Sequence, residues 1–105
     1  MITAKLKMLP ESDKYECWDR PRVFICNQTQ NIIKVIIFKN LKTVFNIFSD
    51  LEKIYQFGFK RYYIFTIDEQ DYRLSASEQK ALFNTLSQFI DDYVEVKGAD
   101  ALEEV

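Results

Sequence analysis

Hydrophobic residues change their spacing at Asn40, and this change most limits what the chain can fold into. Before Asn40 they alternate with polar residues or form short β-branched runs, which is typical of strands. Over residues 41–55 they recur every three or four positions, as in Val44, Phe48 and Leu51. That spacing predicts a helix with one apolar face, and Asn40 is a suitable N-cap. The chain is therefore expected to combine strands and helices in an α+β domain.

Four strands are expected from alternating or β-branched segments bounded by turn residues. They cover residues 2–9, 22–26, 32–39 and 60–68. The second and third are separated by the polar segment 27–31, which predicts a hairpin. Residues 14–20 lie between Pro10 and Pro21, and they fit either a further strand or an irregular loop.

A second helix is predicted after Ser75, because Ser75 and Glu78 have the spacing of a capping box. It should end near Gly98 and leave residues 99–105 as a frayed acidic tail, so that residues 1–98 form a single domain. The expected order is β(β)ββαβα. We predict a two-layer sandwich in which two amphipathic helices cover one mostly antiparallel sheet of four or five strands.

The residue types argue against an enzyme. The 105 residues include no histidine, so the usual general base and the commonest metal ligand are both missing. Gly58 and Gly98 are the only glycines, which excludes a glycine-rich phosphate loop. Cys17 and Cys26 are too few for a zinc site or a disulfide framework. We expect no catalytic residue, no metal and no cofactor.

One alternative uses the acidic segment that contains Asp68, Glu69 and Asp71. Carboxylates at the end of a strand can hold Mg²⁺ for phosphodiester hydrolysis. The element order also resembles the core of the restriction-endonuclease-like nucleases. The segment that should hold their catalytic residues, 30–34, has no carboxylate here. A divalent-metal nuclease is kept as an alternative, beside an acidic turn that only favours the start of the next helix.

A protein-binding site is predicted at Tyr15, Trp18 and Arg20, with Tyr62 as a further contact. Tyr, Trp and Arg are enriched where proteins bind one another, because they combine a large apolar area with a directed polar group. Trp18 could equally close one end of the core. The favoured function is a small regulator, inhibitor or immunity-type protein whose partner the sequence does not identify.

Two other interactions are considered. Lys5, Lys7, Arg61 and Tyr62 could form a basic and aromatic sheet face for nucleic acid. The net charge of −2 gives no overall attraction toward nucleic acid. Val35, Ile37 and the aromatic segment from Tyr62 to Ile67 should leave apolar groups on both sheet faces, while two helices can cover only one. An uncovered apolar patch predicts an interface, and a homodimer is one way to bury it.

The chain has no segment that suggests export or a membrane. Its longest strongly apolar run is residues 35–38, far short of the roughly 20 residues that cross a bilayer. The first residues alternate in hydrophobicity and do not form a signal peptide. We expect a cytoplasmic protein.

Overall fold

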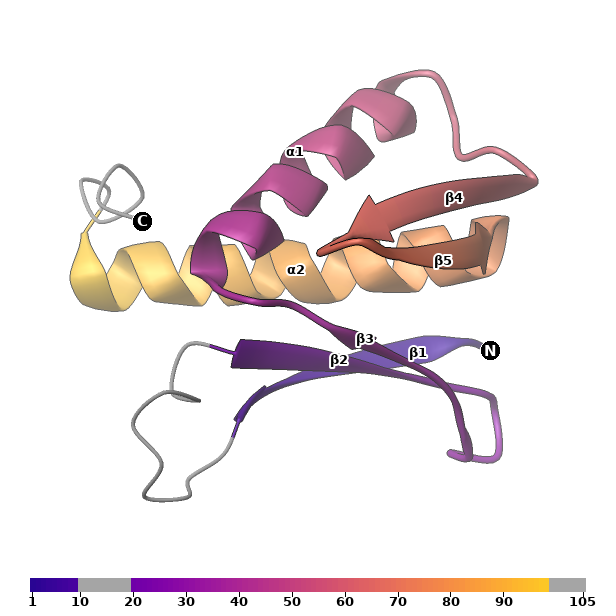
Figure 1. Cartoon of the computed structure of the whole chain (residues 1–105), viewed down its shortest axis with the longest axis horizontal. Coiled ribbons are helices and arrows are strands. Elements are labelled where there is room, and N and C mark those ends of the chain that lie inside the picture. Colours follow the sequence, from indigo (N-terminus) through magenta and orange to yellow (C-terminus); the bar gives the residue numbers. More distant parts are fainter. Residues whose placement is uncertain (10–19, 99–105) are drawn as a thin grey trace.

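The computed structural model describes residues 1–9 and 20–98, which form two antiparallel sheets and two helices in the order βββαββα (Figure 1). The elements are β1 (Thr3–Leu9), β2 (Arg20–Cys26), β3 (Ile32–Ile37), α1 (Leu41–Gln56), β4 (Tyr62–Ile67), β5 (Gln70–Ser75) and α2 (Ala76–Lys97). The predicted α+β class is confirmed. The open question about residues 14–20 falls outside the described residues except for Arg20, and the predicted tail, 99–105, lies wholly outside them.

The prediction of one sheet is wrong, because the strands divide into two sheets. β1, β2 and β3 form a three-stranded sheet in that order, and β4 pairs only with β5. The prediction also missed β5. Asp68 and Glu69 have φ values of 52° and 71°, which is the left-handed backbone of a two-residue hairpin turn. The chain therefore turns back at Asp68 and Glu69, and of the acidic segment only Asp71 belongs to β5.

The two sheets meet at a seam between β3 and β5. Within the described residues this seam is bridged by side chains in place of a β-ladder. Lys34 Nζ donates to the backbone oxygen of Arg73 at 2.5 Å, and the Tyr72 hydroxyl accepts from the backbone N–H of Ile37 at 3.4 Å. Side chains thus satisfy backbone groups at the strand edges that a neighbouring strand would otherwise bind.

The core lies between the helices and the inner faces of both sheets. In Figure 1, α2 runs along the molecule between the three-stranded sheet and α1, and it packs against β1, β2, β4, β5 and α1. The fully buried side chains include Val23, Ile36, Phe38 and Leu82. Each sheet therefore has one face toward the helices and one face away from them.

The start of α2 is tied to both sheets through Glu78. The predicted capping box is present, since Ser75 Oγ accepts from Glu78 N–H and Glu78 Oε1 accepts from Ser75 N–H at 2.9 Å. The same carboxylate binds Lys34 of β3 at 2.6 Å. Burial raises the pKa of Glu78. The hydrogen bonds from Lys34 and Ser75 and the charge of Lys34 lower the pKa by more than burial raises it, so that it lies below its ordinary value.

This shift predicts a dependence of stability on pH. A pKa that is lower in the folded chain than the unfolded value of about 4.3 stabilises the fold above that pH, and the gain disappears as the pH falls through the folded value. Glu78→Gln cannot ionise, so its free energy of unfolding should fall less steeply than that of the wild type below about pH 4.3. Urea melts over a pH series measure this, with Glu52→Gln on the exposed side of α1 as the control. Parallel curves for wild type and Glu78→Gln would show that the pair with Lys34 is not formed.

Candidate protein-binding face

The sheet faces that point away from the helices form one candidate site, here called the outer face. Strand register defines it: Lys5 lies opposite Phe24, which lies opposite Val35, and the neighbouring residues Val23 and Ile36 are buried on the other side. Its members are Lys5, Lys7, Arg22, Phe24, Ile32, Val35 and Ile37 on the first sheet and Tyr62, Ile64, Thr66, Asp71 and Arg73 on the second.

The outer face is continuous across the seam. A hollow of about 420 Å³ is lined by Val35 of β3 together with Tyr62, Arg73 and Asp71 of the second sheet. Since side chains from both sheets share this hollow, the two outer surfaces meet there. A partner that covered one sheet would also contact the other.

A second hollow of about 400 Å³ lies on the three-stranded sheet. Lys5 and Lys7 of β1, Phe24 of β2 and Ile32 of β3 contribute to its lining. Phe24 pairs directly with Val35, so this cross-strand pair stands between the two hollows. The outer face therefore presents two shallow apolar depressions side by side, each with cationic side chains at its margin.

Aliphatic side chains are unusually exposed on this face. Ile32 and Ile64 are each 58% exposed, and Ile37 and Val35 are also exposed. The sequence analysis expected apolar groups on both sheet faces with only one face covered, and on the uncovered face these groups include Val35 and Ile37. Large exposed apolar patches commonly mark interaction surfaces, because water contact with them is unfavourable.

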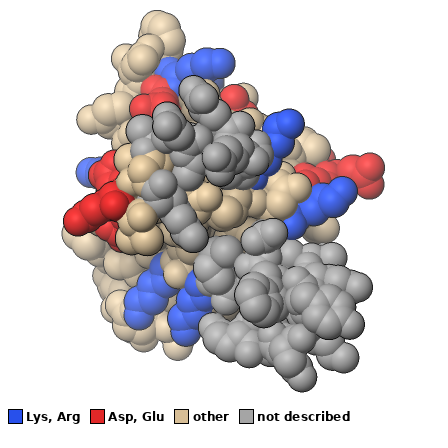
Figure 2. All heavy atoms as spheres, turned by 90° about the vertical axis from the view of Figure 1, so that its left-hand side faces the viewer, with Lys and Arg blue, Asp and Glu red and all other residues tan. Residues whose placement is uncertain are grey.

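The outer face is also positively charged. β1, β2 and β3 together contain five Lys or Arg and no Asp or Glu, but Lys34 lies on the inner side, where it pairs with Glu78 of α2. The second sheet adds one Arg and one Asp to the outer face. In Figure 2 some Lys and Arg side chains lie low, at the height of the three-stranded sheet, with no Asp or Glu side chain beside them among the atoms described, and others lie higher among the Asp and Glu side chains. Lys7 is directly opposite Arg22, an arrangement of like charges that destabilises a sheet.

Tyr62, the predicted contact residue, lies on the outer face and is 49% exposed. The guanidinium carbon of Arg73 stands 4.1 Å from the centre of its ring, and that of Arg61 stands 5.9 Å away. The closer distance is that of a cation–π interaction. Arg73 thus holds the ring in place and occupies one of its faces.

The structure does not describe how the other predicted contacts lie relative to this site. Tyr15 and Trp18 lie outside the described residues, and Arg20 is described only as the first residue of β2. Sequence reasoning missed Phe24, Ile64 and Arg73 as members of the face. The alternation of β2 could have indicated Phe24, but Arg73 required knowledge that residues 70–75 form a strand.

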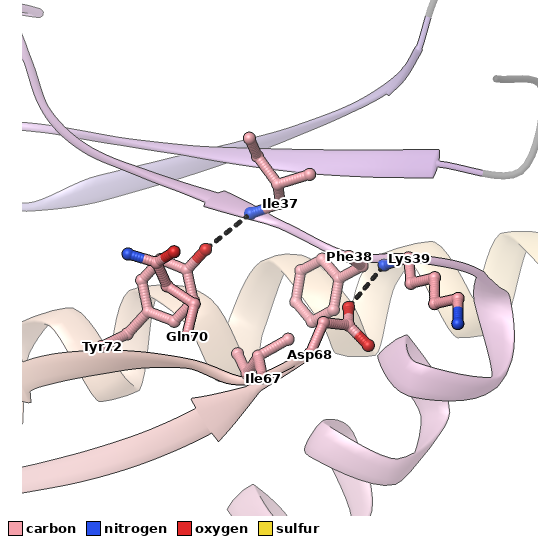
Figure 3. A pocket seen from close by; sticks show the side chains of 7 residues that line it. All are labelled: Ile37, Phe38, Lys39, Ile67, Asp68, Gln70 and Tyr72. Atoms are coloured by element: carbon pink, nitrogen blue, oxygen red, sulfur yellow. Dashed lines mark hydrogen bonds between the residues drawn. The ribbon is translucent and has the colours of Figure 1, made fainter.

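A third hollow, of about 410 Å³, lies at the end of the seam and involves the acidic segment (Figure 3). Asp68 Oδ2 accepts from the backbone N–H of Lys39 at 2.6 Å, which joins the hairpin turn to the entry of α1. Asp71 instead accepts from Thr66 Oγ1 at 2.6 Å, within the hairpin. The two carboxylates therefore have separate structural partners. Among the described residues no group of three or more Asp, Glu, Cys or His could hold a metal ion.

Removal of the Asp68 carboxylate should cost stability. Asp68→Ala loses the bond to Lys39 and places alanine at positive φ, so we expect the free energy of unfolding to fall by about 1–2 kcal/mol. Asp68→Asn keeps an acceptor and tolerates this backbone, so it should cost less. Equal urea midpoints for the alanine variant and the wild type would contradict this structural role.

The chain matches no known family model, no curated protein sequence and no solved structure. It has the fold of a small α+β protein with two antiparallel sheets and an uncovered face. Within residues 1–9 and 20–98, neither helix is both long and apolar enough to cross a membrane.

Proposed function

We propose that the chain is a small, non-catalytic cytoplasmic binding module that recognises a partner protein through its outer face. A regulator, an inhibitor or an immunity-type protein would act in this way. The observation that carries the proposal is the continuous exposure of Ile32, Val35, Ile37 and Ile64 across two sheets. Both helices pack on the inner side, which leaves these side chains for an external partner.

The shape of the face supports a protein partner. Binding energy is concentrated where side chains enter desolvated depressions, and the outer face offers two such depressions beside the Phe24–Val35 pair. Tyr62 and Arg73 are residue types enriched at such centres. Tyr15, Trp18 and Arg20 remain part of the proposal, since their segment enters β2, the strand that supplies Phe24.

Nucleic acid is a second candidate because Lys5, Lys7 and Arg22 share a face with Phe24. Single-stranded nucleic acid is bound by cationic side chains together with open aromatic rings. Here Arg73 occupies one face of Tyr62, and the most exposed large hydrophobic residues on the strands of the outer face, Ile32 and Ile64, are aliphatic. These features favour a protein surface.

Capture of partners from the native cell tests the proposal. Wild-type chain, Val35→Asp and Phe57→Asp would be used as bait in parallel, followed by mass spectrometry and detection of nucleic acid. Phe57 is 89% exposed and follows α1, so it provides a matched apolar-to-acidic control outside the outer face. We expect a protein that wild type and Phe57→Asp retain and Val35→Asp loses. Retention of the same proteins by all three baits would contradict the proposed surface.

A further inference from the structure

The charge of the outer face narrows the kind of partner it fits. We propose that it binds an extended, acidic segment of a partner protein, with aliphatic side chains in the two hollows and carboxylates against Lys5, Lys7 and Arg22. This inference rests on the proposed function and adds the chemistry of the ligand. It is carried by the juxtaposition of basic and aliphatic groups on the two sheets.

The arrangement of the cationic groups destabilises the chain when no partner is bound. Lys7 and Arg22 are direct cross-strand neighbours, and Lys5 lies on the same face two residues before Lys7. Like charges in these positions repel one another, and the strands of this sheet contain no acidic residue to offset them. Carboxylates from a partner would relieve this repulsion and would also direct the encounter.

The hollows suit side chains that protrude from an extended backbone. Alternate residues of a strand point to the same side, so a segment lying across the sheet can place successive side chains into neighbouring depressions. The hollow at Phe24 has Lys5 and Lys7 in its lining, and the hollow at Val35 has both Arg73 and Asp71. An aliphatic residue in each hollow, with Asp or Glu beside the hollow at Phe24, satisfies the apolar floors and the cationic margin formed by Lys5 and Lys7.

The same charges argue against a second copy as the occupant. A two-fold interface presses the same patch of both copies together, so both copies would bring Lys5, Lys7 and Arg22 into it, and the three-stranded sheet has no carboxylate to pair with them. The apolar gain would then be opposed by repulsion in a partly desolvated interface. The homodimer and the nucleic acid become outcomes that the experiment must detect.

The experiment selects binders for the purified full-length chain from a random library of displayed peptides of about 12 residues, long enough to cross the face. Enriched peptides should contain aliphatic residues and more Asp and Glu than the unselected library. Their affinity should fall about tenfold or more in Lys5→Glu/Lys7→Glu and decrease with added salt. The control Lys42→Glu/Lys53→Glu carries the same charge change on exposed α1 positions and should bind as wild type.

The outcomes separate the two proposals. Peptides that require Val35 but lack acidic enrichment would overturn the acidic-segment inference and leave the proposed function standing. Peptides that bind equally to Val35→Asp, or no enrichment at all, would contradict both. Two further results would overturn the inference: tighter binding of a short single-stranded oligonucleotide that depends on Lys5 and Lys7, or dimerisation in sedimentation that Val35→Asp abolishes.

Discussion

Phe38→Ala should lower the free energy of unfolding by about 3–5 kcal/mol, the largest stability change expected for any single substitution considered. Phe38 follows β3 directly, is 0% exposed and belongs to the core that both sheets and both helices share. Alanine would leave a cavity among side chains that cannot collapse fully into it. Small domains have a total stability of about 5–15 kcal/mol, so a large part of it would be lost.

Urea or thermal melts of two other aromatic positions serve as the comparison. Phe57→Ala should leave the melt nearly unchanged, because its ring is 89% exposed. The loss of stability in Phe48→Ala should lie between those in Phe38→Ala and Phe57→Ala, since Phe48 is half-buried and stacks on Phe83 with ring centres 5.4 Å apart. A cost for Phe38→Ala no greater than that for Phe57→Ala would mean that the junction of β3 and α1 does not lie in the core.

Helix positions were predictable because their signals are local. Asn40 caps α1 by accepting from Thr43 N–H, and Ser75 and Glu78 form the expected capping box. The inner face of α1 was predicted less well. Val44 and Leu51 are buried as expected, but Ile47 is buried where the sequence suggested Phe48. α1 packs against both α2 and the sheets, so its covered side is set by neighbours that the period alone does not reveal.

The second sheet was not predictable from the same pattern. Residues 70–75 carry Asp71 and Arg73 on one side and only Tyr72 and Leu74 on the other, so their alternation is short and follows an acidic turn. The division of the sheet depends on contacts that are distant in the sequence. Lys34 binds Arg73 and Glu78 across the seam. Nothing in the local sequence indicates that a lysine side chain will bond there in place of backbone hydrogen bonds between two strands.

The candidate site was predictable only where it depends on strand alternation. Two helices can cover only one face of a sheet, so apolar side chains on the other face should be exposed. The structure has Val35, Ile37 and Tyr62 exposed. That both sheets form one face could not be predicted without knowing where β5 lies. β5 brings Arg73 next to Tyr62 and into the lining of the hollow at Val35. The clustering of Tyr15, Trp18 and Arg20 remains a prediction.

Val35→Asp should weaken partner binding by about 2 kcal/mol or more, roughly 30-fold, with little change in folding stability. Val35 is already partly exposed, so an acidic side chain does not open the core. At the interface it would place an unpaired charge between the two hollows, where the partner excludes water. Matched melting curves for the variant and the wild type exclude loss of fold as the cause.

The most direct test of the outer face is calorimetric titration of the partner, or of a selected peptide, into wild type, Val35→Asp and Phe57→Asp. We predict the same dissociation constant for wild type and Phe57→Asp, and a value roughly 30-fold higher for Val35→Asp. Equal dissociation constants for all three chains, at equal stability, would contradict the assignment of binding to the outer face.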